Sequence, residues 1–176
     1  MPDRCALLMN DAACAGPITI RPAVSADADG IARIFVESAE HHAGFDPERY
    51  SPPTVQIITA RYEQGRQHPP NAVGGGITFV AELSEKVVGF IDSRLELSPD
   101  PMHRKSLYCY IAEFAVSSRH RNRGIGKRLL HAVEGWGRGK GAEFACLEYH
   151  VANIRAHSLY ERLDYRPAST TVVKRL

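Results

Sequence analysis

Residues 111–130 read IAEFAVSSRHRNRGIGKRLL, and they form the most informative stretch of the sequence. An apolar strand is predicted to run into a turn rich in arginine and glycine, which opens directly into an amphipathic helix. Gly124 and Gly126 permit backbone conformations and close approaches that a side chain would block. The start of a helix presents unpaired N–H groups and the positive end of the helix dipole. The stretch is therefore a candidate cradle for a pyrophosphate group.

Two better-known phosphate-binding loops do not match this stretch. A Walker loop needs Gly five residues before its Gly-Lys pair and Ser or Thr after it, but Arg121 and Arg128 stand at those positions. The dinucleotide fingerprint G-x-G-x-x-G fails because Leu129 stands where the third Gly belongs. The alternative interpretation is a solvated basic loop whose glycines serve only its turn.

A second stretch, LEYHVANIRAHSLYERLDYRP at residues 147–167, adds to the pattern. Asn153, Ala156 and Tyr160 share one face of the helix predicted there, and Asn153 is a candidate N-cap. The two stretches resemble the signatures of the GNAT superfamily of N-acetyltransferases. The first matches the acyl-CoA-binding pattern Gln/Arg-x-x-Gly-x-Gly/Ala, and the second matches an Asn followed by Ala and then Leu-Tyr-Glu. The family usually has Gly, a helix-ending residue with positive φ, where this chain has Asp164. Asp adopts that backbone less readily, so this departure from the family bears on the local turn and not on the chemistry.

The resemblance implies an α/β protein with a mixed sheet, the GNAT acyl-CoA N-acyltransferase fold, whose central sheet splays open. Acetyl-CoA, as co-substrate, would lie where the strands at residues 106–116 and 143–149 part, and no metal is needed. Its pyrophosphate would rest on the amides of the arginine-glycine turn. Its pantetheine arm would follow the edge of the first strand, which commonly carries a bulge in this family. The expected cofactor-binding residues are Phe114, Ala115, Val116, Arg121, Asn122, Arg123, Gly124, Ile125, Gly126, Lys127, Asn153, Ala156 and Tyr160.

The reaction implied by the resemblance is direct attack of a primary amine on the thioester. An amine of lysine type has a pKa of about 10.4, so near neutral pH a base must remove its proton, often through water. Glu113 and Glu148 lie in the two strands that part, and either is a candidate; we favour Glu113. The alternative is that one of them only pairs with an arginine. In the context of the family, Tyr160 is expected to protonate the departing thiolate. Without the family resemblance, the simpler interpretation of Tyr160 is an aromatic residue of the core.

The hydrophobic spacing along the chain predicts the element order β-α-α-β-β-β-α-β-α-β. Predicted strands cover residues 18–22, 77–83, 87–95, 106–116, 143–149 and 170–175. Predicted helices cover residues 31–38 after a cap at 25–27, and residues 53–66, 124–136 and 153–163. A polar loop is expected at 41–53, a flexible glycine joint at 74–76, a hairpin turn at 84–86 and a proline-rich loop at 99–101.

The composition bounds the class of protein. A chain of 176 residues with 44% hydrophobic residues points to one globular domain, placed at residues 17–176 after a loosely ordered tail at residues 1–16. Four scattered cysteines without a C-x-x-C pair favour free thiols in a reducing compartment. The apolar run at the N-terminus fits neither a signal peptide nor a membrane span. We therefore expect a cytoplasmic protein with no membrane partner.

The charge is unevenly distributed although the net charge is only +2. Residues 1–100 hold 8 Lys and Arg against 14 Asp and Glu, a net of −6, whereas residues 101–176 hold 14 against 6, a net of +8. The basic half suggests an anionic partner. Nucleic acid is the weaker choice, because no aromatic residue interleaves the basic turn. A non-catalytic acyl-CoA-binding sensor is another alternative.

The acceptor is expected to be a small-molecule or peptide amine, and homodimers are common in the family. His41 and His42 lead into the loop that in this family usually lines the acceptor pocket, and with His120 and His150 they are weaker candidates for the base. Acidic residues of the same half could attract a cationic acceptor or form a solvated helix face. These are Glu37, Glu40, Asp46 and Glu48.

Overall fold

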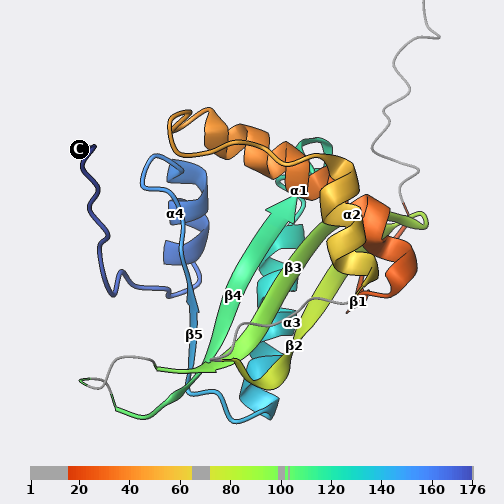
Figure 1. The fold of residues 1–176 in the computed structure, drawn as a ribbon. Coiled ribbons are helices and arrows are strands. Elements are labelled where there is room, and N and C mark those ends of the chain that lie inside the picture. The colour runs from red at the N-terminus through yellow and green to blue at the C-terminus, as the bar shows by residue number, and fades with distance from the viewer. Residues whose placement is uncertain (1–15, 65–71, 99–101, 103, 176) are drawn as a thin grey trace, which may run out of the picture.

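The structure, a computed structural model, describes residues 16–64, 72–98, 102 and 104–175. Its described strands form one mixed sheet in the order β1-β2-β3-β4-β5, in which β4 and β5 run parallel and the other neighbours antiparallel (Figure 1). The strands are β1 (Thr19–Pro22), β2 (Ala72–Leu83), β3 (Lys86–Leu97), β4 (Leu107–Val116) and β5 (Phe144–Leu147). The helices are α1 (Ala28–Ala43), α2 (Val55–Glu63), α3 (Ile125–Gly139) and α4 (Ile154–Glu161), with 3₁₀ turns η1 (Ser25–Asp27) and η2 (Ser118–His120).

The helices cover both faces of the sheet. Helices α1 and α2 lie over one face, α3 lies over the other, and α4 stands beside β5 (Figure 1). Successive residues of a strand point to opposite faces, so Phe90 packs with Ile31 under α1 while its neighbour Ile91 packs with Leu129 and Val133 of α3. Two apolar layers therefore hold one sheet, as the mixed α/β fold class predicts.

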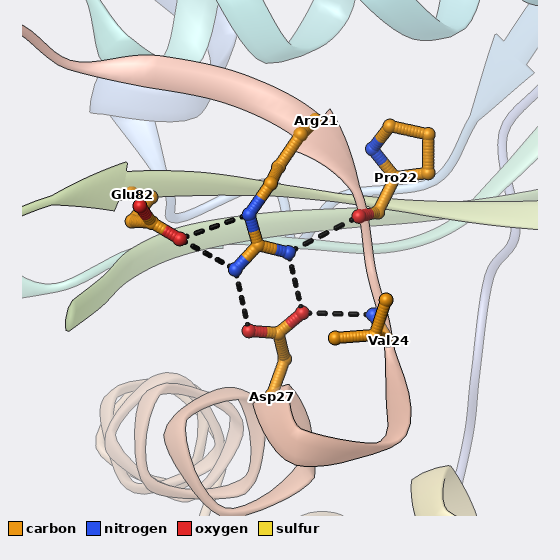
Figure 2. Close-up of polar contacts among 5 residues, drawn as sticks. All are labelled: Arg21, Pro22, Val24, Asp27 and Glu82. Atoms are coloured by element: carbon orange, nitrogen blue, oxygen red, sulfur yellow. Dashed lines mark hydrogen bonds and ion pairs between the residues drawn. The ribbon is translucent and has the colours of Figure 1, made fainter. Parts of the chain in front are cut away.

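Arg21 ties β1 to the start of the first helix and to β2 (Figure 2). Its guanidinium donates to both carboxylate oxygens of Asp27, at 2.7 and 2.8 Å, and through Nε to Glu82 at 2.9 Å. Asp27 is only 6% exposed and also accepts from the amide of Val24 at 2.8 Å. The hydrogen bonds from Arg21 lower the pKa of the Asp27 carboxyl, so it stays ionised in its buried place.

Much of the predicted element order is confirmed. The hairpin turn lies at Ser84 and Glu85, which both adopt positive φ, the backbone that a two-residue turn between twisted strands requires. Asp164 has φ +61°, so the turn after the last helix is kept although Asp replaces the usual Gly. The turn delivers Tyr165 to α3, where its hydroxyl donates to Glu134 at 2.9 Å.

Three predicted boundaries are wrong. Helix α1 continues to Ala43 instead of giving way to a loop at residue 41, and the His42 ring bonds back to the Ser38 carbonyl at 2.8 Å. The glycines at 74–76 belong to β2, where they accompany a register shift against β3 instead of a free joint. Strand β5 ends at Leu147, because its pairing with β4 stops there.

The strand predicted at residues 170–175 is also wrong. These residues form no strand, and Val172 and Val173 are 87% and 63% exposed. The β-branched residues that suggested a strand have no neighbouring strand to pair with in the described part of the chain, and β propensity depends on such packing. The predicted tail at residues 1–16 and loop at 99–101 fall almost wholly outside the described residues.

The tightest approach between a helix and the sheet lies at Gly137 of α3. A Cβ on Gly137 would come 2.7 Å from the Cβ and 2.9 Å from the Sγ of buried Cys109 in β4. We expect Gly137→Ala to lower the free energy of unfolding by about 1–3 kcal/mol through overpacking. Chemical denaturation measures this change.

Gly135 provides the matched control, because a Cβ there meets nothing within 4 Å on the same helix. Gly135→Ala should stabilise the protein by about 0.5–1 kcal/mol, since alanine loses less conformational freedom than glycine on folding. Equal effects of the two substitutions would show that α3 does not pack on β4 in this way.

Candidate active site

Strands β4 and β5, at one end of the strand order, part after a short paired stretch. Their pairing runs from Tyr108 opposite Phe144 to Ile111 opposite Leu147 and ends there. Strand β4 continues to Val116 with β3 on one side and no strand on the other among the described residues, and Figure 1 shows the two strands diverging toward α1. The edge of β4 at residues 112–116 therefore has no neighbouring strand in the described part of the chain, and an extended ligand would fit along it.

A bulge in β4 lies at the point of parting. Asp92 of β3 pairs with Glu113, but the next residue, Ser93, pairs with Ile111, so Ala112 is an extra residue on β4. A bulge bends a strand and increases its local twist, which turns β4 away from β5. The bulge that the resemblance implied for this strand is confirmed.

The turn after β4 leads directly into the N-terminus of α3. Asn122 and Gly124 have φ of +63° and +74°, and Gly124 is the N-cap residue of α3. No side chain caps this helix, and the first helical bond runs from the amide of Arg128 to the carbonyl of Gly124 at 3.1 Å. The amides of the three residues between them have no helical acceptor and point ahead of the helix axis. These amides lie where the sequence predicts the anion cradle.

Gly126 lets three elements meet at this cradle. A Cβ there would lie 3.1 Å from the Phe114 ring on β4 and 3.4 Å from Leu159 on α4. The Phe114 ring in turn lies 6.4 Å from the ring of Tyr160 on α4, measured between centroids. The structure thus brings together the predicted residues Phe114, Gly126 and Tyr160.

The side chain of Arg121 faces the protein. Its Nε donates to the carbonyl of Val116 at 3.1 Å, and its Nη2 lies 4.0 Å from the carboxylate of Glu37 on α1. The same Glu37 oxygen accepts from the amide of Ser118 at 2.6 Å. Glu37 therefore holds the turn after β4 to α1, a role that the sequence did not reveal.

Helix α4 begins at Asn153, whose Oδ1 accepts from the amide of Ala156 at 3.1 Å. This confirms the N-cap predicted for Asn153 and leaves its side-chain NH₂ group for another partner. Arg155, the second residue of α4, donates from Nη2 to the Oδ1 of Asn122 at 2.5 Å. The start of α4 thus contacts the turn that precedes α3.

Tyr160 is 8% exposed and lies among the rings of Phe114, Tyr149 and Tyr165. Burial, with a smaller effect of Tyr149, raises the pKa of the Tyr160 hydroxyl well above its usual range. The hydroxyl therefore keeps its proton at any physiological pH. It can donate a hydrogen bond, but full proton transfer to a thiolate is less favourable than for an ordinary tyrosine.

The two candidate bases lie in different surroundings. Glu113 belongs to β4, and its carboxylate lies 3.9 Å from the Nη2 of Arg61 on α2. Glu148 follows the last residue of β5 and is exposed, so the prediction that it lies within an apolar strand is wrong. The arginine pairing considered for one of the two glutamates is found at Glu113.

A cluster of rings joins the end of α1 to the segment between β5 and α4. Phe45 lies 4.6 Å from His41 and stacks on His150 at 5.4 Å, with Tyr50 completing the group 6.1 Å from His150. Burial lowers the pKa of His41, and the charges of Arg121 and Arg155 lower it further. His150 lies at least 100 residues after the other three rings in the sequence, and no local pattern predicts that they meet.

The sequence profile of the Acetyltransferase (GNAT) family matches residues 35–165, which include the parted strands and both motifs. The chain belongs to this family. Curated relatives are N-acetyltransferase 8B of Rattus norvegicus, 38% identical over 88 residues, and N-acetyltransferase 8 of Homo sapiens, 29% identical over 92 residues. These matches cover 50% and 52% of this GNAT chain but only 38% and 39% of the relatives.

Solved structures share the GNAT fold. A mutant protein from Bacillus halodurans superposes with a TM-score of 0.80 at 21% identity, over 90% of this chain and 99% of that one. An aminoglycoside N-acetyltransferase in complex with CoA gives a TM-score of 0.65 at 17% identity, over 91% and 95% of the two chains. The splayed mixed sheet implied by the resemblance is therefore confirmed.

Neither a metal centre nor a membrane helix is found in the part of the chain that the structure describes. No three His, Cys, Asp or Glu side chains gather there to hold an ion, and none of its helices is both long and apolar enough to cross a bilayer.

Glu37 offers a test of how the cradle is held. Glu37→Ala removes the acceptor of the Ser118 amide and the anion beside Arg121, so we expect a loss of about 1–3 kcal/mol in the free energy of unfolding. Hydrogen exchange of the Ser118 amide should become faster. Glu40→Ala, an exposed position on the same helix, should change the stability by less than about 0.5 kcal/mol. Unchanged exchange at Ser118 in Glu37→Ala would refute the assigned role.

Proposed function

We propose that the chain is an N-acetyltransferase that transfers the acetyl group of acetyl-CoA to a primary amine by direct attack in a ternary complex. The observation that carries this proposal is that the open edge of β4 leads directly into the uncapped N-terminus of α3. Acetyl-CoA consists of an extended pantetheine arm joined to a diphosphate. The arm would match the edge of β4, and the diphosphate would match the start of α3.

The chain would bind the co-substrate mainly through its backbone. The amides between Gly124 and Arg128 would hold the diphosphate, because they are the unpaired donors at the positive end of the α3 dipole. The edge of β4 that leaves β5, at residues 112–116, would pair with the amides of the pantetheine arm. The side-chain NH₂ of Asn153, whose oxygen already caps α4, is available to the same arm.

Glu113 is proposed to accept the proton of the attacking ammonium, directly or through water. Deprotonating an amine of pKa about 10.4 at pH 7 costs about 4–5 kcal/mol, so the amine needs such a base. Glu113 lies next to the bulge at the point where β4 leaves β5, and its carboxylate lies 3.9 Å from the Nη2 of Arg61. Glu148, exposed beyond β5, is the weaker candidate.

Tyr160 is proposed to donate a hydrogen bond to the sulfur that leaves the thioester. It projects from α4 toward the Phe114 ring on the open half of β4, and its hydroxyl stays protonated because burial raises its pKa. A donor aimed at a developing thiolate stabilises the transition state even where the proton is not fully transferred.

The relatives limit what is proposed about the acceptor. Two structural neighbours are aminoglycoside acetyltransferases, and one of them was solved in complex with sisomicin. Because their identity to this chain is below 25%, they share its fold but do not specify its acceptor. The acceptor class proposed is therefore a small-molecule or peptide amine. That the domain forms a homodimer stays a prediction.

Steady-state acetyl transfer to a panel of aminoglycosides, polyamines and peptides, followed as release of the CoA thiol, tests the proposal. Tyr160→Phe keeps the ring that packs on Phe114 and should lower kcat by about 100-fold. Glu113→Gln should lower kcat/KM at neutral pH. The ratio of wild-type to Glu113→Gln kcat/KM should fall by about tenfold for each unit of rising pH, because the free amine becomes more abundant.

Tyr108→Phe is the control, because this tyrosine stacks on Phe144 in the paired half of the sheet and should leave turnover unchanged. Binding of acetyl-CoA without turnover of any amine would identify a non-catalytic acyl-CoA-binding module instead. Full activity in both site variants would leave water as the base and remove Tyr160 from the reaction.

A further inference from the structure

We propose that Arg155, held by Asn122 at the turn that precedes α3, is a phosphate ligand of the CoA site. This inference rests on the proposed function, because it assigns a further residue to the same binding site. The ligand chemistry is a phosphoryl oxygen of CoA, in either its diphosphate or its 3′-phosphate.

The position of Arg155 follows from the packing of α4 against the start of α3. Leu159 of α4 contacts Gly126, where an added Cβ would lie 3.4 Å from the leucine Cδ2. Arg155 lies four residues before Leu159, so it occupies the same face of α4 one turn closer to the helix N-terminus. That face directs the guanidinium to the turn ahead of α3, where it bonds to Asn122.

The charge of Arg155 is held in place without being neutralised. Seven other arginines pair with a carboxylate within 4.0 Å. These are Arg21, Arg33, Arg49, Arg61, Arg94, Arg121 and Arg175. In the described part of the chain, the hydrogen-bond partner of Arg155 is the neutral amide oxygen of Asn122. A guanidinium has five N–H donors, so most of them remain for an anion.

Arg121, the motif arginine, is not in a position to serve the same role with its side chain. Its guanidinium is bonded to the Val116 carbonyl and lies beside Glu37. Both arginines act electrostatically on His41 at the end of α1, so their charges lie in one neighbourhood. Of the two arginines, Arg155 is the one whose charge is not neutralised. Because Asn122 already holds its side chain, binding a phosphate would cost little additional side-chain entropy.

Calorimetric titration of CoA and of 3′-dephospho-CoA tests the assignment. Arg155→Met should weaken CoA binding by about tenfold or more, as expected for the loss of a charge-assisted hydrogen bond. Asn122→Gly keeps the positive φ of residue 122 but removes the oxygen that positions Arg155, so a smaller loss is expected. Arg162→Met, an exposed position at the other end of α4, should bind like the wild type.

The two ligands distinguish the phosphate involved. A loss seen with CoA but not with 3′-dephospho-CoA assigns Arg155 to the 3′-phosphate, and an equal loss with both assigns it to the diphosphate. Either result supports the proposal, provided that ligand-free Arg155→Met unfolds at the same thermal midpoint as ligand-free Arg162→Met. Equal affinities of Arg155→Met and Arg162→Met for both ligands would overturn it. Failure of the wild type to bind either ligand would instead refute the proposed function.

Discussion

The parting of β4 from β5 is the constraint on which the rest of the structure depends. Parallel pairing stops at Ile111 and Leu147, and the bulge at Ala112 turns β4 away while β3 still supports its other edge. A strand edge without a neighbouring strand leaves backbone N–H and C=O groups without sheet partners, which costs free energy. Here the edge of β4 leads, through the turn at residues 117–124, to the amides at the start of α3, and these two regions are the proposed binding surface for the co-substrate.

The side chains around this surface mainly hold the backbone in place. Glu37 anchors the turn to α1, Arg121 folds back on Val116, and Asn153 caps α4. A site built from backbone amides needs this support, because its donors must keep their direction when no ligand is bound. Arg155 differs from these residues, since its charge is positioned but not neutralised.

The parts of the site that depend on local sequence were predictable. The glycine turn and the Asn153 cap follow from residues within a few positions of each other, and the structure confirms both. The end of β5 was not predictable, since it is decided by where β4 stops pairing, and Glu148 consequently lies outside the strand. The bond from Ser118 to Glu37 joins residues 81 apart, and such contacts depend on how α1 packs over the completed sheet.

The most direct test of the central claim compares two glycines with the same backbone. Gly124 at φ +74° lies in the cradle and Gly141 at φ +85° lies beyond the far end of α3, and a Cβ on either meets nothing within 4 Å. Glutamate should strain both turns alike but place a carboxylate at the phosphate site only in Gly124→Glu. In calorimetric titration with acetyl-CoA, we predict that the wild type and Gly141→Glu bind and that Gly124→Glu does not. Equal binding by both variants would contradict the account.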